Sequence, residues 1–219
     1  MANFNAKIKI DGKELQQKIR YALGDIINDA AIVAQKPIEN RLKQLIRFNF
    51  LQSPETLSMV AGRLQGDFGF TSGEAYVIPV IDWIVNRIRV DRVPYSLRGG
   101  VKKKIYKISL AYFDLDELTS LPTASYLNNV NVRRNIDWLE WLLTRGNKPI
   151  IYGYEADFGG YPRSRSRSGI AIMVRSDKNW RVPSQFSGTI RNNWITRVYK
   201  SSEQSVLNII EDEFIKGLP

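Results

Sequence analysis

The sequence contains neither cysteine nor histidine among its 219 residues. The absence of cysteine excludes disulfide bonds and thiolate nucleophiles, and the absence of histidine excludes Ser-His-Asp triads and histidine general bases. Without either residue type, nearly every zinc site is excluded as well. Carboxylates, lysine, tyrosine and serine remain for catalysis. The composition therefore favours a binding or structural protein over an enzyme, and we expect no cofactor and no metal.

Long apolar runs are also lacking. No run approaches the ~18 residues of a membrane-spanning helix, so we expect no contact with a membrane. The first ten residues have no apolar stretch of the kind that export signals carry. With 43% apolar and 25% charged residues, the composition is that of an ordinary globular chain. The length suits one sizeable core or two small ones. We expect a single domain over 1–219, with a helical part at about 11–66 and a sheet-containing part at about 67–219.

Charge is present in excess of one sign and is unevenly distributed. The net charge is +10, yet residues 87–107 carry eight cations against one acid and residues 163–181 carry six against one. These two segments sum to +12, so the rest of the chain is slightly acidic, notably after residue 203. Segregation of this kind bears on partners and on association rates rather than on the fold.

Apolar residues spaced by three and four predict helices at both ends of the chain. Such a stripe runs over 15–33 and resumes over 38–50, and Pro37 between them predicts a long broken helix or a pair of helices. Ser53 followed by Pro54 is typical of a helix start. A short helix is expected over 135–145 and a last helix from about 188 onward.

Four segments are expected to form strands: 87–95, 104–113, 150–158 and 170–174. Alternation of period two marks the second and third, and the wholly apolar 170–174 predicts a central strand. Residues 74–88 are ambiguous between a helix and a bent strand, and 67–70 read as a turn or short strand. This order predicts an α+β fold, in which long N-terminal helices and a C-terminal helix pack on a mainly antiparallel sheet with long basic hairpin loops.

The loop between the last two expected strands carries arginine on alternate residues, at Arg163, Arg165 and Arg167. An extended loop would project the three guanidinium groups to one side, and each could bind a phosphate or carboxylate through two hydrogen bonds. The loop is therefore a candidate contact with nucleic acid or with an acidic protein surface. A solvated hairpin tip is the equally weighted alternative.

A second basic loop contains Lys102, Lys103 and Lys104 after two glycines. Glycine-rich loops with lysine can bind phosphate, but the spacing GxxxxGK[ST] is missing and no helix clearly follows. A flexible basic hairpin loop is the favoured interpretation. We retain these lysines, with the three arginines, as candidate interface residues.

The densest acidic cluster before the C-terminal helix consists of Asp114, Asp116 and Glu117. Magnesium binding or paired-carboxylate catalysis would need these oxygens to converge with others. Polarity at the end of a strand is the favoured explanation. The tryptophans could stack on nucleic-acid bases, but aromatic residues at helical spacing are more often part of a core, which is what we expect here.

The C-terminal half also resembles a known family. The segments that carry the resemblance are Trp138–Leu143, Ile150–Tyr154, Ser166–Val174, Trp180–Thr189 and Asn192–Arg197, with Ser53–Glu55, Gly62–Leu64 and Asp67–Gly69 earlier in the chain. Together they are similar to small head–tail joining, neck, tail-completion or minor tail proteins of tailed bacteriophages. The motifs are short and contain no catalytic residues to carry over.

This resemblance implies a structural virion protein, assembled in the host cytoplasm. It implies several copies of one chain in a ring around the channel that DNA crosses, in contact with neighbouring connector or tail proteins. Two other hypotheses stay open. A metal-dependent nuclease or carboxylate hydrolase would need Asp114, Asp116 or Glu117 to converge with a distant acid. A nucleic-acid-binding module would place both basic loops on one face, with exposed aromatic residues between them.

Overall fold

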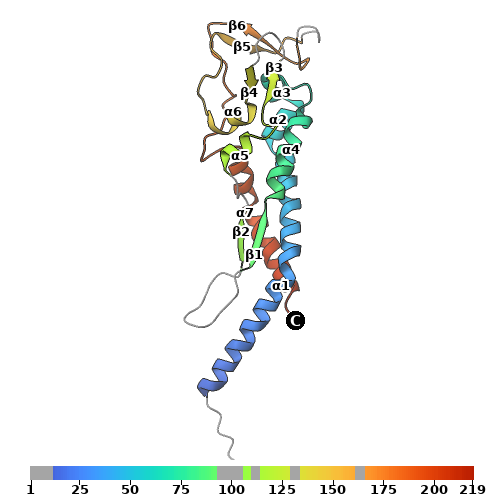
Figure 1. Cartoon of the computed structure of the whole chain (residues 1–219), viewed down its shortest axis with the longest axis vertical. Coiled ribbons are helices and arrows are strands. Elements are labelled where there is room, and N and C mark those ends of the chain that lie inside the picture. The colour runs from blue at the N-terminus through green and yellow to red at the C-terminus, as the bar shows by residue number, and fades with distance from the viewer. Residues whose placement is uncertain (1–11, 93–105, 110–113, 129–133, 161–165) are drawn as a thin grey trace, which may run out of the picture.

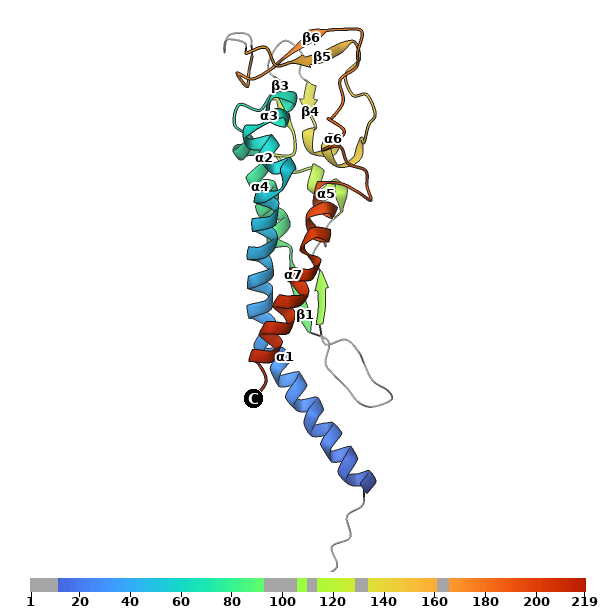
Figure 2. The same ribbon diagram turned by 180° about the vertical axis from the view of Figure 1, so that it is seen from behind.

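Two long helices lie side by side along the molecule: α1 (Gly12–Gln52) and α7 (Trp194–Lys216) (Figures 1 and 2). They come from opposite ends of the chain. The computed structural model describes residues 12–92, 106–109, 114–128, 134–160 and 166–219. The first part of α1 leaves the body at an angle and continues beyond the end of α7.

The interior position of Pro37 does not divide α1 into two helices. Proline has no N–H to donate to the preceding turn, so one helical hydrogen bond is lost. Packing compensates for it, because the residues around and after Pro37 bury one continuous face: Ala34, Ile38, Leu42, Ile46 and Phe50. The predicted apolar stripe therefore belongs to one uninterrupted helix, and the predicted break at Pro37 is absent from α1.

Three short helices follow: α2 (Pro54–Ala61), α3 (Arg63–Phe68) and α4 (Gly73–Asn86). Ser53 caps α2 as predicted, with its side chain accepting a hydrogen bond from the backbone of Thr56. The ambiguous segment 74–88 is helical through Asn86, whereas Asp67 and Phe68 end a helix instead of forming a strand. At Gly73 a Cβ atom would lie 2.0 Å from the carbonyl oxygen of Met59, so only glycine lets α4 start against α2.

The strands form three antiparallel pairs among the described residues: β1 (Arg89–Arg92) with β2 (Tyr106–Ser109), β3 (Tyr126–Asn128) with β4 (Arg134–Ile136), and β5 (Tyr154–Asp157) with β6 (Ile172–Arg175). Along the chain, α5 (Leu115–Thr119) lies between β2 and β3, and α6 (Trp138–Thr144) lies between β4 and β5. The α+β class is confirmed. The prediction of a central strand at 170–174 is wrong, because β6 pairs with β5 alone and every second residue of it is exposed.

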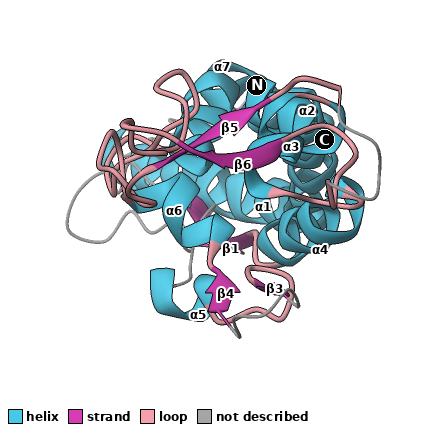
Figure 3. Ribbon diagram, turned by 90° about the horizontal axis from the view of Figure 1, so that it is seen from above, coloured by secondary structure: helices cyan, strands magenta, loops and turns pink. Residues whose placement is uncertain are grey.

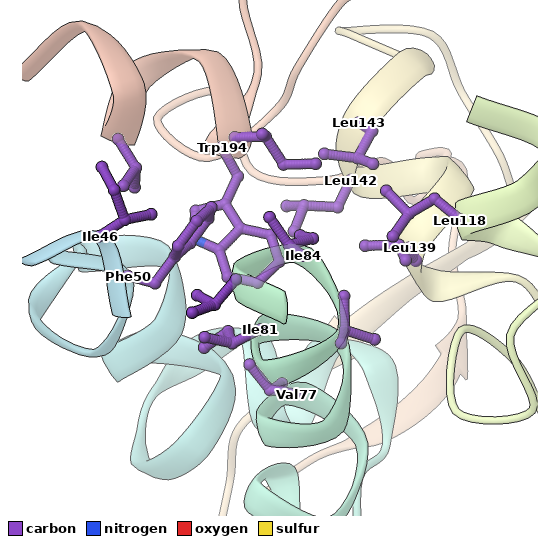
Figure 4. Packing of buried hydrophobic residues seen from close by; sticks show 14 of the residues in the cluster. Ile46, Phe50, Val77, Ile81, Ile84, Leu118, Leu139, Leu142, Leu143 and Trp194 are labelled. Atoms are coloured by element: carbon purple, nitrogen blue, oxygen red, sulfur yellow. The ribbon is translucent and has the colours of Figure 1, made fainter. Parts of the chain in front are cut away.

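The aromatic residues that sequence spacing assigned to the core are found there. The rings of Phe50 on α1 and Trp194 on α7 meet edge to face with centroids 5.1 Å apart (Figure 4). Aliphatic side chains of α4 and α6 surround them. Trp138 and Trp180 are also buried. Within the described ranges, no helix combines the length and the hydropathy that a membrane crossing requires.

Candidate interaction surface

The residues predicted to contact a partner are only partly within the described chain. Arg163, Arg165 and Lys102–Lys104 lie outside the described residues. Arg167 lies within them and is exposed. The structure therefore defines the points at which the two basic loops join the body.

Two serines fasten the end of the arginine loop. The Ser166 hydroxyl is buried, donates to the carbonyl of Ala171 at 2.7 Å and accepts from the N–H of Gly169 at 3.0 Å. The Ser168 hydroxyl accepts from the N–H of Ile170 at 3.2 Å. These local bonds form a tight turn. Their consequence is that the side chain of Ser166 is buried while the neighbouring Arg167 is exposed.

Helix α3 packs against this turn. A Cβ atom at Gly66 would lie 2.8 Å from the ring of Phe158 and 3.0 Å from the side chain of Ile170. Since glycine has no Cβ, the two ends of the β5–β6 connection can pack directly on α3. Arg63 on the same helix lies over the Phe158 ring at 5.5 Å. The turn therefore stands on a packed helical surface.

An aromatic residue holds Arg167 in place. The guanidinium carbon of Arg167 lies 4.6 Å from the ring centroid of Tyr126, which is the geometry of a cation–π contact. The Tyr126 hydroxyl donates to the carbonyl of Phe68, and its ring packs 5.8 Å from Phe70 and 5.3 Å from Tyr76. Burial raises the pKa of Tyr126 to about 12, although the positive charge of Arg167 acts in the opposite direction. Tyr126 was not singled out in the sequence, because no spacing relates it to a loop about 40 residues away.

The β5–β6 pair covers one end of the helices (Figure 3), and we call the surface formed by the described residues of 150–160 and 166–181 the β5–β6 end. The sequence over 150–181 carries six cations and three acids. Large apolar side chains are exposed on this end as well: Tyr152 at 70%, together with Tyr154, Phe158 and Met173. Exposed aromatic residues among cations suit a partner surface that carries both apolar and acidic groups.

The second basic loop starts from β1 and β2, which are attached to α1. The Gln35 amide donates to the carbonyl of Val90 at 2.8 Å, and the N–H of Val90 donates to Glu39 at 3.4 Å. Burial tends to raise the pKa of Glu39, but hydrogen bonding and charge from Lys43 and the charge of Lys36 outweigh it and hold that pKa below its ordinary value. The base of this loop is thus fixed to the middle of α1, away from the β5–β6 end (Figures 1 and 2).

The acidic cluster is dispersed. Glu117 pairs with Arg87 at 2.5 Å, and Arg87 also lies over the ring of Trp83 at 3.4 Å. Asp114 occupies the position before α5, and Asp116 lies in its first turn. Over the ranges that the structure covers, no three acidic side chains gather as metal ligands would. Glu117 is thus held in an ion pair, and Asp114 and Asp116 lie at the start of α5, where the helix dipole favours acidic side chains.

Comparison with known proteins adds no relative: no family model, no curated protein and no solved structure matches the chain.

Proposed function

We propose that the chain is a structural subunit of a tailed-bacteriophage virion, located in the neck, the head–tail connection or the tail-completion ring. The observation that carries the proposal is the different chemistry of the two ends of an elongated subunit. One end is the cationic and aromatic β5–β6 end, and the other is the extended first part of α1. The sequence resemblance points to the same class of protein.

Such a shape suits a subunit that joins two layers of an assembly. In a ring, each subunit needs one surface for its neighbour and another for the next layer. Arg167 and the turn beneath it are anchored by Ser166, Gly66 and Tyr126, so the arginine loop leaves the body from a defined position. We propose that this loop docks on an acidic surface of a neighbouring connector or tail protein. The other partners are copies of the same chain, close to the DNA in the channel.

The nucleic-acid-binding alternative has less support. It predicts both basic loops on one face, yet the described base of one loop lies beside the middle of α1 and the base of the other lies at the β5–β6 end. The nuclease alternative requires free, convergent acids, whereas Glu117 is paired with Arg87.

The test is complementation of a phage that lacks this gene. The variant Arg163→Ala, Arg165→Ala, Arg167→Ala should leave thermal stability nearly unchanged and block the joining of heads to tails. A control variant, Lys36→Ala, Lys148→Ala, Lys200→Ala, removes the same charge from exposed positions elsewhere. We expect the control to give joined, infectious particles in normal numbers by electron microscopy.

Two results would contradict the proposal at different levels. Normal yields of joined particles with the arginine variant would show that the loop is only a solvated tip. Purified virions without any copy of the chain would overturn the structural role itself.

A further inference from the structure

The first part of α1 has an apolar face without a cover. We call residues 12–29 the arm. Ile19, Leu23 and Ile26 on the arm are 51%, 50% and 39% exposed, and Val33 just after it is 64% exposed. Their spacing of four, three and seven residues places them on one side of the helix. The later half of α1 buries an apolar face against the body, whereas the apolar face of the arm has no such cover among the described residues.

A helix with this exposed apolar face is a candidate for contact with a partner. Most helical stability in proteins comes from packing an apolar face. Exposed clusters of large apolar side chains mark interaction sites. The question is therefore which surface covers the arm.

The outer face of α7 has the matching properties. Glu203, Leu207, Glu211 and Ile215 recur every four residues, so acidic and apolar side chains alternate along one line. Leu207 is 54% exposed and Ile215 is 58% exposed. Neither glutamate forms an ion pair with another described residue. The start of the arm is cationic, with Lys13, Lys18 and Arg20 against Glu14, whereas Asp25 and Asp29 lie near its end.

The lengths of the two surfaces also agree. At about 1.5 Å per residue, the apolar face from Ile19 to Val33 and the line from Glu203 to Ile215 each extend roughly 20 Å. The arm cannot cover α7 of its own chain along this line, because it continues beyond the C-terminal end of α7 (Figure 2). A second copy can supply the surface.

We infer that the arm of one copy packs along the outer face of α7 in a second copy. The two surfaces differ, so the contact is head-to-tail and repeats from copy to copy until a ring closes. A contact this long and one helix wide (about 10 Å) covers about 200 Å², well below the about 800 Å² per partner of a stable pair. A single contact is therefore weak, and closure of the ring strengthens it. The inference rests on the proposed function in one respect: the arm–α7 contact would be the lateral contact between subunits of the proposed ring.

The absence of cysteine permits a direct test with the full chain. One chain carries Ala22→Cys on the arm, and a second, lengthened by a tag, carries Asn208→Cys on α7; both positions are exposed. The two are mixed at millimolar concentration under mild oxidation. We expect the mixed disulfide dimer to exceed both same-variant dimers severalfold. Replacing Ala22→Cys by Asn40→Cys, on the exposed side of α1 within the body, should remove this excess.

Charge reversal provides the second measurement. Arg20→Glu in the arm should reduce the mixed dimer severalfold, and Glu203→Lys with Glu211→Lys in the partner should restore it. A predominance of arm–arm dimers, or no excess of the mixed dimer over the Asn40→Cys control, would overturn the inference.

The same pair of cysteines separates this inference from the proposed function. In phage particles, a chain with both Ala22→Cys and Asn208→Cys should give a ladder of disulfide-linked multimers. Mixed dimers in solution but no chain in virions would leave the contact standing and refute the function. A chain present in virions that forms neither the ladder nor the mixed dimer would refute the contact alone.

Discussion

The indole Nε1 of Trp180 donates a 3.0 Å hydrogen bond to Oδ1 of Asp67, across 113 residues of sequence. Arg63 donates to the other carboxylate oxygen at 3.2 Å, and the Asp67 side chain is only 1% exposed. Burial raises the pKa of Asp67, and the bonds from Trp180 and Arg63 offset it only in part. The pair ties α3 to the segment after β6.

The first prediction concerns the pH dependence of this tie. Because the folded-state pKa of Asp67 lies above its ordinary value of 3.8, the folded chain binds the proton more tightly than the unfolded chain. The stabilisation that protonated Asp67 contributes is complete below the unfolded-state pKa, and it is lost as the pH rises through the folded-state pKa. We expect the free energy of unfolding of the wild type, minus that of Asp67→Asn, to fall as the pH rises above about 4. Urea denaturation measures it, with the exposed Asp177→Asn as control. A constant or rising difference would contradict the prediction.

The second prediction concerns Ser53, whose hydroxyl links three elements. It caps α2, donates to the carbonyl of Phe50 at 2.8 Å and accepts from the indole of Trp194 at 2.9 Å. Ser53→Ala removes the cap and leaves a buried N–H without its partner, so we expect a loss of about 2–3 kcal/mol in the free energy of unfolding. Ser205→Ala on the exposed side of α7 should change it by less than about 0.5 kcal/mol. An effect of Ser53→Ala as small as that of Ser205→Ala would show that neither the cap nor the Trp194 bond contributes.

Much of the helical framework follows from local chemistry in the sequence. The apolar period of α1 and the Ser53 cap each act over a few residues, so they can be recognised without tertiary structure. The boundaries of the strands could not be predicted in this way. Residues 170–174 are apolar because Ile170 and Ala171 pack on Gly66, not because they lie at the centre of a sheet.

The candidate surface was predictable only in its charged residues. Arginine on alternate positions is visible in the sequence, and it led to Arg167. Two residues hold Arg167 and its turn in place. Tyr126 lies 41 positions before Arg167 and Gly66 lies 101 positions before it, and neither has a local signal in the sequence. The uncovered apolar face of the arm was likewise hidden, because Ile19, Leu23 and Ile26 look like core residues in a periodic pattern.

The third prediction tests the packing of the loop base on α3. Gly66→Ala gains about 0.5–1 kcal/mol of helix propensity but forces a Cβ against Phe158 and Ile170, and overpacking of this kind costs about 1–3 kcal/mol. The cost exceeds the gain, so we expect a net destabilisation of about 1 kcal/mol, measured by urea denaturation. Gln65→Ala in the same helix is the control and should change stability by less than about 0.5 kcal/mol. A more stable Gly66→Ala protein would mean that Phe158 moves aside freely.

The last prediction uses Tyr126, the ring beneath Arg167. Burial raises its pKa to about 12 from 10.0, so the unfolded chain loses the phenolic proton first as the pH rises. The stabilisation is full below the unfolded value and is lost as the pH approaches the folded one. We expect the free energy of unfolding of the wild type, minus that of Tyr126→Phe, to shrink between about pH 10 and about pH 12. At neutral pH this difference should be about 1 kcal/mol, since the variant loses the bond to Phe68. Tyr152→Phe, at a 70% exposed ring, is the control and should show no such pH dependence.

Because the exposed cation–π contact contributes only about 0.5–1 kcal/mol, Arg167→Ala should fold normally, and any loss of head–tail joining with that variant reflects docking rather than stability.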